Sequence, residues 1–269
     1  MPAAARGPRR PARFARPVRS LLAMITITGM DLRATPTVPK RALVVSAHPD
    51  DVDFGAAGTV ARLTGAGTDV HYCIVTDGDA GEAPEGVARA DVGALRQAEQ
   101  RAAAAAVGVE DVRFLGYPDG RLEVTLDLRR DLSGVIREVE PEVVICQSPE
   151  RRWDRVFASH PDHLAAGEAT LQAVYPDARN PYAHPELAGR GLGPHAVKEV
   201  WVMAHPQANR YVDISDTYDA KLAALRAHAS QTGHVDLDAL IGGWTGATAL
   251  EGGLPEGRRA EAFYTCLSG

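Results

Sequence analysis

Two short segments of the chain carry side chains that bind metal ions, and both have the composition of a tight turn. The first is Ala47-His48-Pro49-Asp50-Asp51, and the second, far along the chain, is Ser159-His160-Pro161-Asp162-His163. Imidazole nitrogens and carboxylate oxygens are good zinc ligands, and catalytic zinc sites usually have three protein ligands and a water. The two segments are therefore interpreted as halves of one metal site, which predicts a metal hydrolase.

The spacing within the segments suggests a role for each side chain. His48 and Asp51 are three residues apart, so a turn after a strand can direct both at one ion, and His163 is the natural third ligand. Asp50 would then be free to take a proton from the bound water, and His160 would lie close to that water or to the substrate carbonyl. Either segment alone could be an ordinary turn or helix cap, but the pair favours catalysis.

Alternating strand-like and helix-like stretches must position these turns. Apolar runs predict strands at Ala42–Ala47, Val70–Thr76, Val112–Leu115, Val143–Gln147 and Val197–Met203. Helical patterns lie between them at Gly55–Thr64, Val92–Val107 and Leu126–Val139. This order favours an α/β fold with a mostly parallel sheet flanked by helices. The first segment would follow a central strand at its carboxyl end, where such folds place their chemistry.

The chain divides into a leader and one domain. Residues 1–37 are rich in Pro, Ala and Arg, which predicts a disordered or extraneous leader, and residues 38–269 form the predicted single domain. An export or transit signal is the alternative for the leader, because Arg9-Arg10 precedes a mildly apolar stretch. Within the domain, the irregular region Tyr175–His195 is rich in Pro and Gly and could be a loop over the site.

Composition excludes several classes of function. The chain has 269 residues, of which 45% are hydrophobic and 24% charged, as in soluble globular proteins. No apolar run approaches the roughly 20 residues of a membrane span. The net charge is −6 although six arginines precede the first acid, Asp31, so the body is strongly acidic and nucleic acid is not the expected partner. Three cysteines without a C-x-x-C pair suggest buried thiols and a cytoplasmic location.

A dinucleotide site is a poor explanation of the first turn. Such a site needs G-x-G-x-x-G directly after the first strand, so that the backbone can approach a pyrophosphate. Here His48-Pro49-Asp50-Asp51 stands in that place, and two carboxylates there would repel phosphate.

At these residues the sequence resembles the PIG-L/LmbE-type zinc deacetylases, which remove acyl groups from N-acetylglucosamine-like amides. Ala-His-Pro-Asp-Asp and His-Pro-Asp-His are both present in full. Further similarity lies at Thr76-Asp77-Gly78, at Arg96 and Glu99, and at Phe114–Gly120, and it ends near Gln231. The resemblance implies a Rossmann-like α/β domain, which agrees with the pattern of strands and helices.

The resemblance also implies individual roles. It implies His48, Asp51 and His163 as ligands of Zn²⁺, Asp50 as the general base, and His160 as the residue that stabilises the oxyanion or helps to protonate the leaving amine.

Three further positions match the family pattern. Asp162 would orient His160 by hydrogen bonding, and Arg96 and Asp119 would hold sugar hydroxyls or a neighbouring group. Two alternatives stay open: Arg96 could pair with Glu99, and Asp119 could belong to a simple Pro-Asp-Gly turn.

One position departs from the family pattern. Many members have Glu after the two aspartates, where this chain has Val52 followed by Asp53. Asp53 could replace that acid or could cap a helix that begins near Phe54. We expect zinc binding to survive, but the departure weakens any detailed substrate assignment taken from Glu-containing members.

The expected substrate is a small acylated amine or amino sugar. The alternatives are a zinc amidase acting on a non-sugar metabolite or thiol conjugate, and a sugar-binding relative that has lost turnover. The resemblance is also compatible with a homo-oligomer, since family members often form one.

Overall fold

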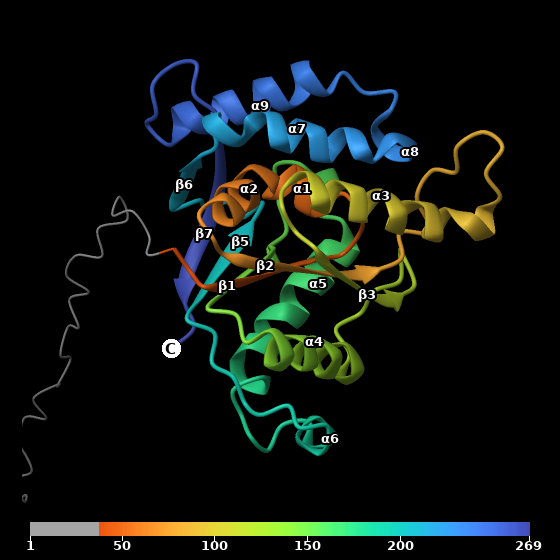
Figure 1. Ribbon diagram of the computed structural model, residues 1–269, viewed down its shortest axis with the longest axis vertical. Coiled ribbons are helices and arrows are strands. Elements are labelled where there is room, and N and C mark those ends of the chain that lie inside the picture. The colour runs from red at the N-terminus through yellow and green to blue at the C-terminus, as the bar shows by residue number, and fades with distance from the viewer. Residues whose placement is uncertain (1–37) are drawn as a thin grey trace, which may run out of the picture. The chain divides into compact units, whose positions relative to one another are not determined.

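The computed structural model describes residues 38–269, and its centre is one seven-stranded sheet (Figure 1). The strands are β1 (Arg41–Ser46), β2 (Asp69–Thr76), β3 (Asp111–Tyr117), β4 (Val143–Gln147), β5 (Glu199–Met203), β6 (Arg210–Asp213) and β7 (Ala260–Leu267). Their order is β3-β2-β1-β4-β5-β7-β6. Neighbours from β3 to β5 are parallel, and β7 runs antiparallel to both β5 and β6. The predicted mostly parallel sheet is confirmed, whereas the predicted leader lies outside the described residues.

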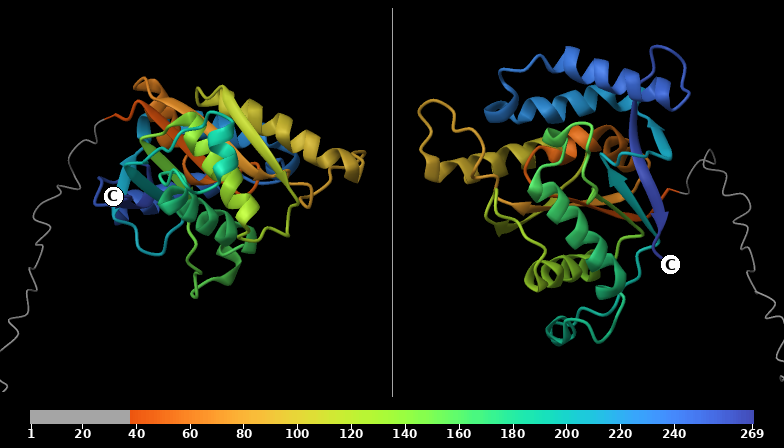
Figure 2. Two further views of the ribbon diagram at one scale, coloured as in Figure 1. Left: turned by 90° about the horizontal axis from the view of Figure 1, so that it is seen from below. Right: turned by 180° about the vertical axis from the view of Figure 1, so that it is seen from behind.

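Helices cover both faces of the sheet. They are α1 (Asp51–Gly55), α2 (Ala57–Gly65), α3 (Val92–Ala106), α4 (Leu126–Val139), α5 (Pro161–Gln172), α6 (Pro185–Gly189), α7 (Tyr218–Ala227), α8 (Ala229–Thr232) and α9 (Leu237–Glu251). Short helical turns span Arg89–Asp91, Val156–Ala158, Ala173–Asp177 and Ser215–Thr217. Figures 1 and 2 show α1, α2, α3 and α7 on one face, with α9 outside α7, and α4 and α5 on the other. In residues 38–269, no helix is both long and apolar enough to cross a membrane.

The strand order places the two histidine segments side by side. The chain moves outward from β1 through β2 to β3, then returns to β4 on the other side of β1. The carboxyl ends of β1 and β4 therefore border the crevice at which the strand order reverses, where α/β folds bind ligands. The first segment leaves β1, and the second leads into α5, the helix that follows β4.

Most predicted elements are confirmed, because their burial follows their apolar pattern. Strand β4 and helix α4 have the predicted bounds, and α3 ends one residue before the predicted end. Gly108 follows it with a φ of +79°, a left-handed conformation that suits glycine after a helix. Strand β1 is buried from Ala42 onward, as expected for a central parallel strand.

The helix predicted over Gly55–Thr64 is present as α2, but it begins two residues later than predicted, because the chain breaks at Ala56 (φ −146°, ψ 0°) after the short helix α1. A buried ion pair stabilises the break. The Lys221 ammonium donates to the carbonyls of Asp53 (2.8 Å) and Phe54 (2.6 Å) in α1 and to the Glu261 carboxylate (2.7 Å). Glu261 in turn accepts the backbone N–H groups of Gly58 (3.0 Å) and Thr59 (2.7 Å) in the first turn of α2. A cation at one helix end and an anion at the next both complement the helix dipoles.

The irregular region Tyr175–His195 does not lie over the two histidine segments, which corrects that expectation. The Arg137 guanidinium in α4 donates to the carbonyls of Asp177 (2.9 Å), Ala178 (3.1 Å) and Asn180 (2.8 Å). A ring nitrogen of His195 lies 2.7 Å from the carbonyl of Pro141, which precedes β4. These contacts hold the region against α4 and beside the amino end of β4. That end of the strand is opposite the end at which the two histidine segments lie.

The Lys221–Glu261 pair gives a test of the fold. The two side chains are 0% and 3% exposed, so Lys221→Met would leave Glu261 buried without its cation. We expect the free energy of unfolding to fall by about 3–5 kcal/mol, measured by urea denaturation. The matched control Lys198→Met removes an ammonium that is 71% exposed, and should cost about 1 kcal/mol or less. Equal midpoints for the parent and Lys221→Met would contradict this account.

Candidate metal centre

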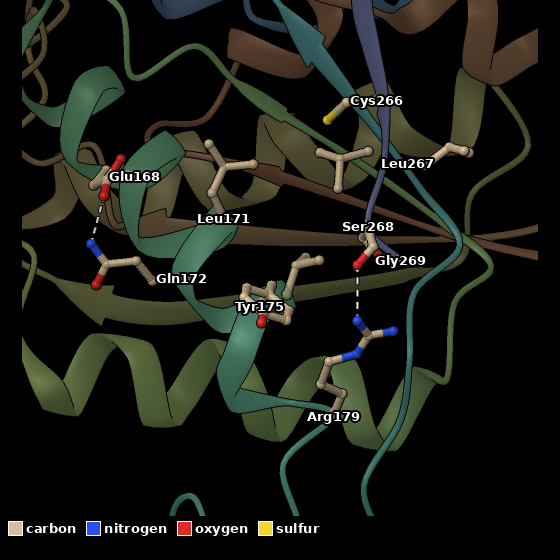
Figure 3. Close-up of a pocket in the computed structure, with 11 residues that line it drawn as sticks. Glu168, Leu171, Gln172, Tyr175, Arg179, Cys266, Leu267, Ser268 and Gly269 are labelled. Carbon is tan, nitrogen blue, oxygen red and sulfur yellow. Dashed lines mark hydrogen bonds between the residues drawn. The ribbon is translucent and has the colours of Figure 1, made fainter. Parts of the chain in front are cut away.

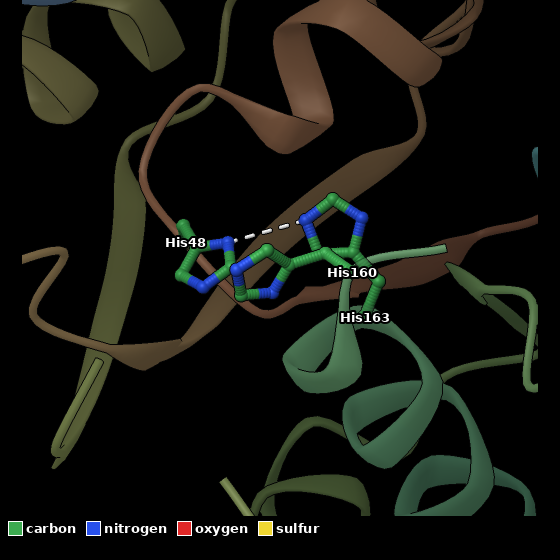
Figure 4. A group of neighbouring side chains, drawn as sticks. All are labelled: His48, His160 and His163. Carbon is green, nitrogen blue, oxygen red and sulfur yellow. Dashed lines mark hydrogen bonds between the residues drawn. The ribbon is translucent and has the colours of Figure 1, made fainter. Parts of the chain in front are cut away.

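Three candidate ligand side chains converge where the two segments meet. His48 Nδ1 lies 3.2 Å from Asp51 Oδ2 and 3.2 Å from His163 Nε2. His163 Nε2 is in turn 3.0 Å from Asp51 Oδ1. Figure 4 shows the rings of His48, His160 and His163 gathered at this point, between the turn after β1 and the start of α5. The convergence that the sequence suggested for His48, Asp51 and His163 is present.

Local backbone geometry directs these side chains. Asp50 adopts a left-handed conformation with a φ of +89°, which turns the chain sharply between β1 and α1. Asp51 Oδ2 then accepts the backbone N–H of His48 at 2.7 Å, so the ligands of the first segment also fasten its turn. In the second segment, Pro161 starts α5, where a missing N–H costs nothing, and His163 follows in the first turn.

The other ring nitrogen of His48 contacts two carboxylates. Nε2 lies 3.1 Å from Asp119 Oδ1 and 3.2 Å from Asp162 Oδ2. A carboxylate that accepts the Nε2 hydrogen leaves the Nδ1 lone pair for a cation, as is common around metal-binding histidines.

His48, Asp119 and Asp162 also have ligand atoms close enough to hold a cation by themselves. However, Asp162 already accepts the N–H groups of Gly120 (2.7 Å) and Leu122 (3.2 Å), and Asp119 accepts that of Ala80 (3.1 Å). With these lone pairs engaged, the two carboxylates are better placed to orient His48 than to bind a second ion.

The position of Asp162 corrects one expectation. Its carboxylate contacts His48 and not His160, because the side chain lies inward, 1% exposed, beneath the first turn of α5. Only its backbone N–H reaches His160, donating to Nδ1 at 3.2 Å. Since Nδ1 accepts, the hydrogen of the neutral His160 ring is on Nε2.

Arg96 and Asp119 form part of the wall of the site. The Arg96 guanidinium donates to the carbonyls of Gly78 (2.9 Å) and Pro49 (2.7 Å) and to Asp50 Oδ2 (3.0 Å). The alternative pair of Arg96 with Glu99 is wrong, because the Glu99 carboxylate accepts the N–H and hydroxyl of Ser230. Both Arg96 and Asp119 thus support site residues, and substrate contact by either stays a prediction.

Asp53 neither caps a helix nor reaches the ligand atoms. The N-cap of α1 is Asp50, and Asp53 lies inside the helix at 0% exposure. Its carboxylate accepts a hydrogen bond from the side-chain amide of Gln100 at 2.9 Å and contacts His228 Nε2 at 2.8 Å. Val52 is buried in the apolar core. Sequence reasoning missed Gln100, although its position four residues after Arg96 puts both on one face of α3.

The site attracts positive charge. Burial lowers the pKa of His48, but Asp119 and Asp51 outweigh it and raise this pKa to about 11. Burial raises the pKa of Asp51, but His163 and His48 hold it well below its usual range. A place where two imidazoles and a carboxylate lie this close requires a shared proton or a cation, and the residues present fit a metal ion.

The pKa values of the two remaining site residues, Asp50 and His160, are shifted in opposite directions. Burial and the neighbouring Asp51 raise the pKa of Asp50 to about 7, against the opposing effect of Arg96. Burial and the nearby His48 and His163 rings lower the pKa of His160. A carboxylate with a pKa near neutrality suits general acid–base chemistry.

A separate cavity of about 730 Å³ lies away from this cluster (Figure 3). Its walls include Leu171 and Tyr175 on one side and Leu267 on the other, and Arg179 donates to the carbonyl of Ser268 at 2.9 Å. None of the predicted site residues lines it, so the geometry of the converging ligands, and not the cavity volume, identifies the candidate site.

Comparison with known proteins supports this location. A family model described as GlcNAc-PI de-N-acetylase matches residues 43–174, which include both segments. The chain is 33% identical to diacetylchitobiose deacetylase of Thermococcus kodakarensis over 71% of this chain and 70% of that protein. It is 34% identical to a probable N-acetyl-α-D-glucosaminyl L-malate deacetylase 2 of Bacillus cereus over 72% of this chain and 84% of that protein.

A solved structure agrees with the fold. N,N′-diacetylchitobiose deacetylase of Pyrococcus horikoshii, complexed with an inhibitor, superposes with a TM-score of 0.81 at 26% identity, covering 89% of this chain and 88% of that one. The two histidine segments, the sheet that brings them together and these relatives lead to one conclusion: the chain belongs to the PIG-L family of de-N-acetylases.

Proposed function

We propose that the protein is a zinc-dependent N-deacetylase that hydrolyses the acetamide of an N-acetylglucosamine-like small molecule. The observation that carries this proposal is the convergence of His48 Nδ1, Asp51 and His163 Nε2 within 3.2 Å of one another at the switch point of the sheet. The relatives named for acetamido-sugar substrates support the substrate class.

The donor set supports zinc as the metal. Two imidazoles and one carboxylate are three protein ligands of the kind found at catalytic zinc sites, which keep a further position for water. When bound, Zn²⁺ polarises a carbonyl and lowers the pKa of water toward ~7. His48, Asp51 and His163 would hold it.

Asp50 is the proposed general base. Its carboxylate belongs to the same turn as Asp51, and the Arg96 guanidinium donates to Oδ2 at 3.0 Å. The other oxygen, Oδ1, would therefore accept a proton from the attacking water. Asp50 takes this proton as the water oxygen bonds to the amide carbon. When the C–N bond breaks, the same proton passes to the leaving nitrogen, which gives acetic acid and the free amine. The acid then loses its remaining proton, and the amine takes one up, so that acetate and an ammonium group are the products at neutral pH.

His160 is the proposed hydrogen-bond donor to the carbonyl oxygen. Its Nδ1 is engaged by the backbone of Asp162, and its depressed pKa keeps the ring neutral, with the hydrogen on Nε2. A neutral donor suffices to stabilise negative charge on that oxygen, and the loss of one such donor typically costs about 10²–10³ in turnover. Protonation of the ring is therefore not required for this role.

The Asp50 assignment is tested by Asp50→Ala. We expect kcat to fall by about 10²–10⁴, because general-base catalysis contributes that much, while zinc stays bound. Amine release from N-acetylglucosamine-type substrates, with metal analysis of the same sample, measures both quantities. The matched control Asp127→Ala removes an exposed carboxylate in α4 and should leave both unchanged. Hydrolysis by Asp50→Ala at the parent rate would refute the role of Asp50.

The metal assignment is tested in two ways: by removing the metal with a chelator, and by altering Asp162, the carboxylate that orients His48. Dialysis against chelator should abolish amine release, and one equivalent of Zn²⁺ should restore it. Asp162→Asn should weaken zinc affinity by about 10–100-fold, because it alters the group that orients His48. The exposed Asp154→Asn is the control.

The same assays separate the alternatives. Zinc binding without release from amino sugars, but with release from other acylated amines, indicates a non-sugar amidase. A protein that binds sugar without zinc or turnover would be a non-catalytic relative. Cytoplasmic location and self-association stay predictions.

A further inference from the structure

A buried chain of polar groups lies beneath the turn that carries Asp50. The side-chain amide of Gln100, in α3, joins two parts of that turn. Its Oε1 accepts the backbone N–H of Asp50 at 2.8 Å, and its Nε2 donates to Asp53 Oδ2 at 2.9 Å. The same oxygen of Asp53 is 2.8 Å from His228 Nε2.

These groups have no access to solvent, so water does not compete for their hydrogen bonds. Gln100, Asp53 and His228 are each 0% exposed. The Asp53 carboxylate can only accept, which forces the Gln100 amide nitrogen toward it and the amide oxygen toward Asp50. A buried polar group that loses its partner pays the full desolvation penalty, so the network favours one arrangement of the turn.

The turn needs such a restraint because its backbone is strained. Asp50 is a non-glycine residue with a φ of +89°, a conformation that costs free energy and persists only when its surroundings impose it. Its carbonyl accepts the N–H groups of Asp53 (2.9 Å) and Phe54 (3.0 Å), which fixes one side of the residue. Gln100 fixes the other side through the Asp50 N–H.

Two residues of α3 therefore hold Asp50 in different ways. Arg96 contacts its carboxylate and the preceding carbonyl of Pro49, whereas Gln100 contacts only its backbone and the helix that follows. Rotation of the Asp50 peptide would turn the carboxylate away even if Arg96 stayed in place.

We propose that Gln100, itself held by Asp53 and His228, is a positioning residue that fixes the Asp50 peptide and thereby directs the Asp50 carboxylate in the proposed deacetylation. The inference rests on the proposed function for its effect on turnover, but not for its effect on the backbone. Gln100 contacts neither the metal ligands nor the expected place of the substrate.

The decisive variant is Gln100→Met, which keeps the length of the side chain but removes both hydrogen bonds. We expect kcat to fall about 10–100-fold, as small displacements of catalytic groups do, with KM within twofold and one equivalent of zinc retained. Gln100→Glu should be at least as damaging, because it places a carboxylate against that of Asp53.

A conservative pair tests the far end of the network. His228→Gln can still donate a hydrogen bond to Asp53 and should retain most of the parent kcat. His228→Leu cannot donate, and its kcat should fall by about the same factor as that of Gln100→Met. Equal activity of the two His228 variants would contradict the proposed chain.

A stability control separates positioning from general loosening. Arg129→Met removes a bidentate contact between α4 and Asp177 (2.9 and 2.8 Å) that includes no residue of the network. It should lower the melting temperature while kcat stays at the parent value. If kcat falls in Arg129→Met in proportion to the melting temperature, or if zinc is lost in parallel with activity in Gln100→Met, the role of Gln100 is merely structural.

Amide hydrogen exchange of Asp50, followed by NMR, gives a readout that does not need a substrate. Exchange of the Asp50 N–H should be at least tenfold faster in Gln100→Met than in the parent, and unchanged in Arg129→Met. If the parent releases no amine from any substrate, the proposed function fails while this result still decides the role of Gln100. Unchanged exchange in Gln100→Met overturns the inference.

Discussion

The site depends on one imidazole that uses both of its nitrogens. His48 Nδ1 meets Asp51 and His163, and Nε2 meets Asp119 and Asp162, so the ring joins four side chains from three parts of the chain. A ring fixed on one side by carboxylates has its remaining lone pair aimed in one direction, which prepares a ligand before any ion arrives. These parts of the chain meet at the carboxyl ends of β1 and β4, where the strand order reverses.

Residues from the C-terminal third of the chain stabilise the helices that follow the first histidine segment. Lys221 and Glu261 stabilise the break between α1 and α2, and His228 contacts Asp53 one turn before that break. The turn that carries the ligands is thus held by buried charges from distant elements as well as by its own hydrogen bonds. Buried charges are costly unless paired, so these contacts favour a single conformation of the turn.

Family membership leaves the amine to be determined. The relatives carry names for a disaccharide and for a sugar joined to malate, so the shared chemistry lies in the acetamide and the differences lie in the group attached to it. The irregular region Tyr175–His195 contacts α4 and the residue before β4 instead of the histidine segments.

The amino-acid sequence by itself determined the ligand types, the two turns, the bounds of β4 and α4, and the mostly parallel sheet, because each depends on local residue type or on the period of apolar residues. Tertiary structure decided what depends on partners far away in the chain. The helix predicted at Gly55–Thr64 begins at Ala57 instead, because Lys221 binds the end of α1 and Glu261 binds the start of α2. Asp162 faces His48 because it lies on the buried side of α5. Gln100 became visible only as a neighbour of Asp50, since a hydrogen bond between residues fifty positions apart leaves no periodic trace in the sequence.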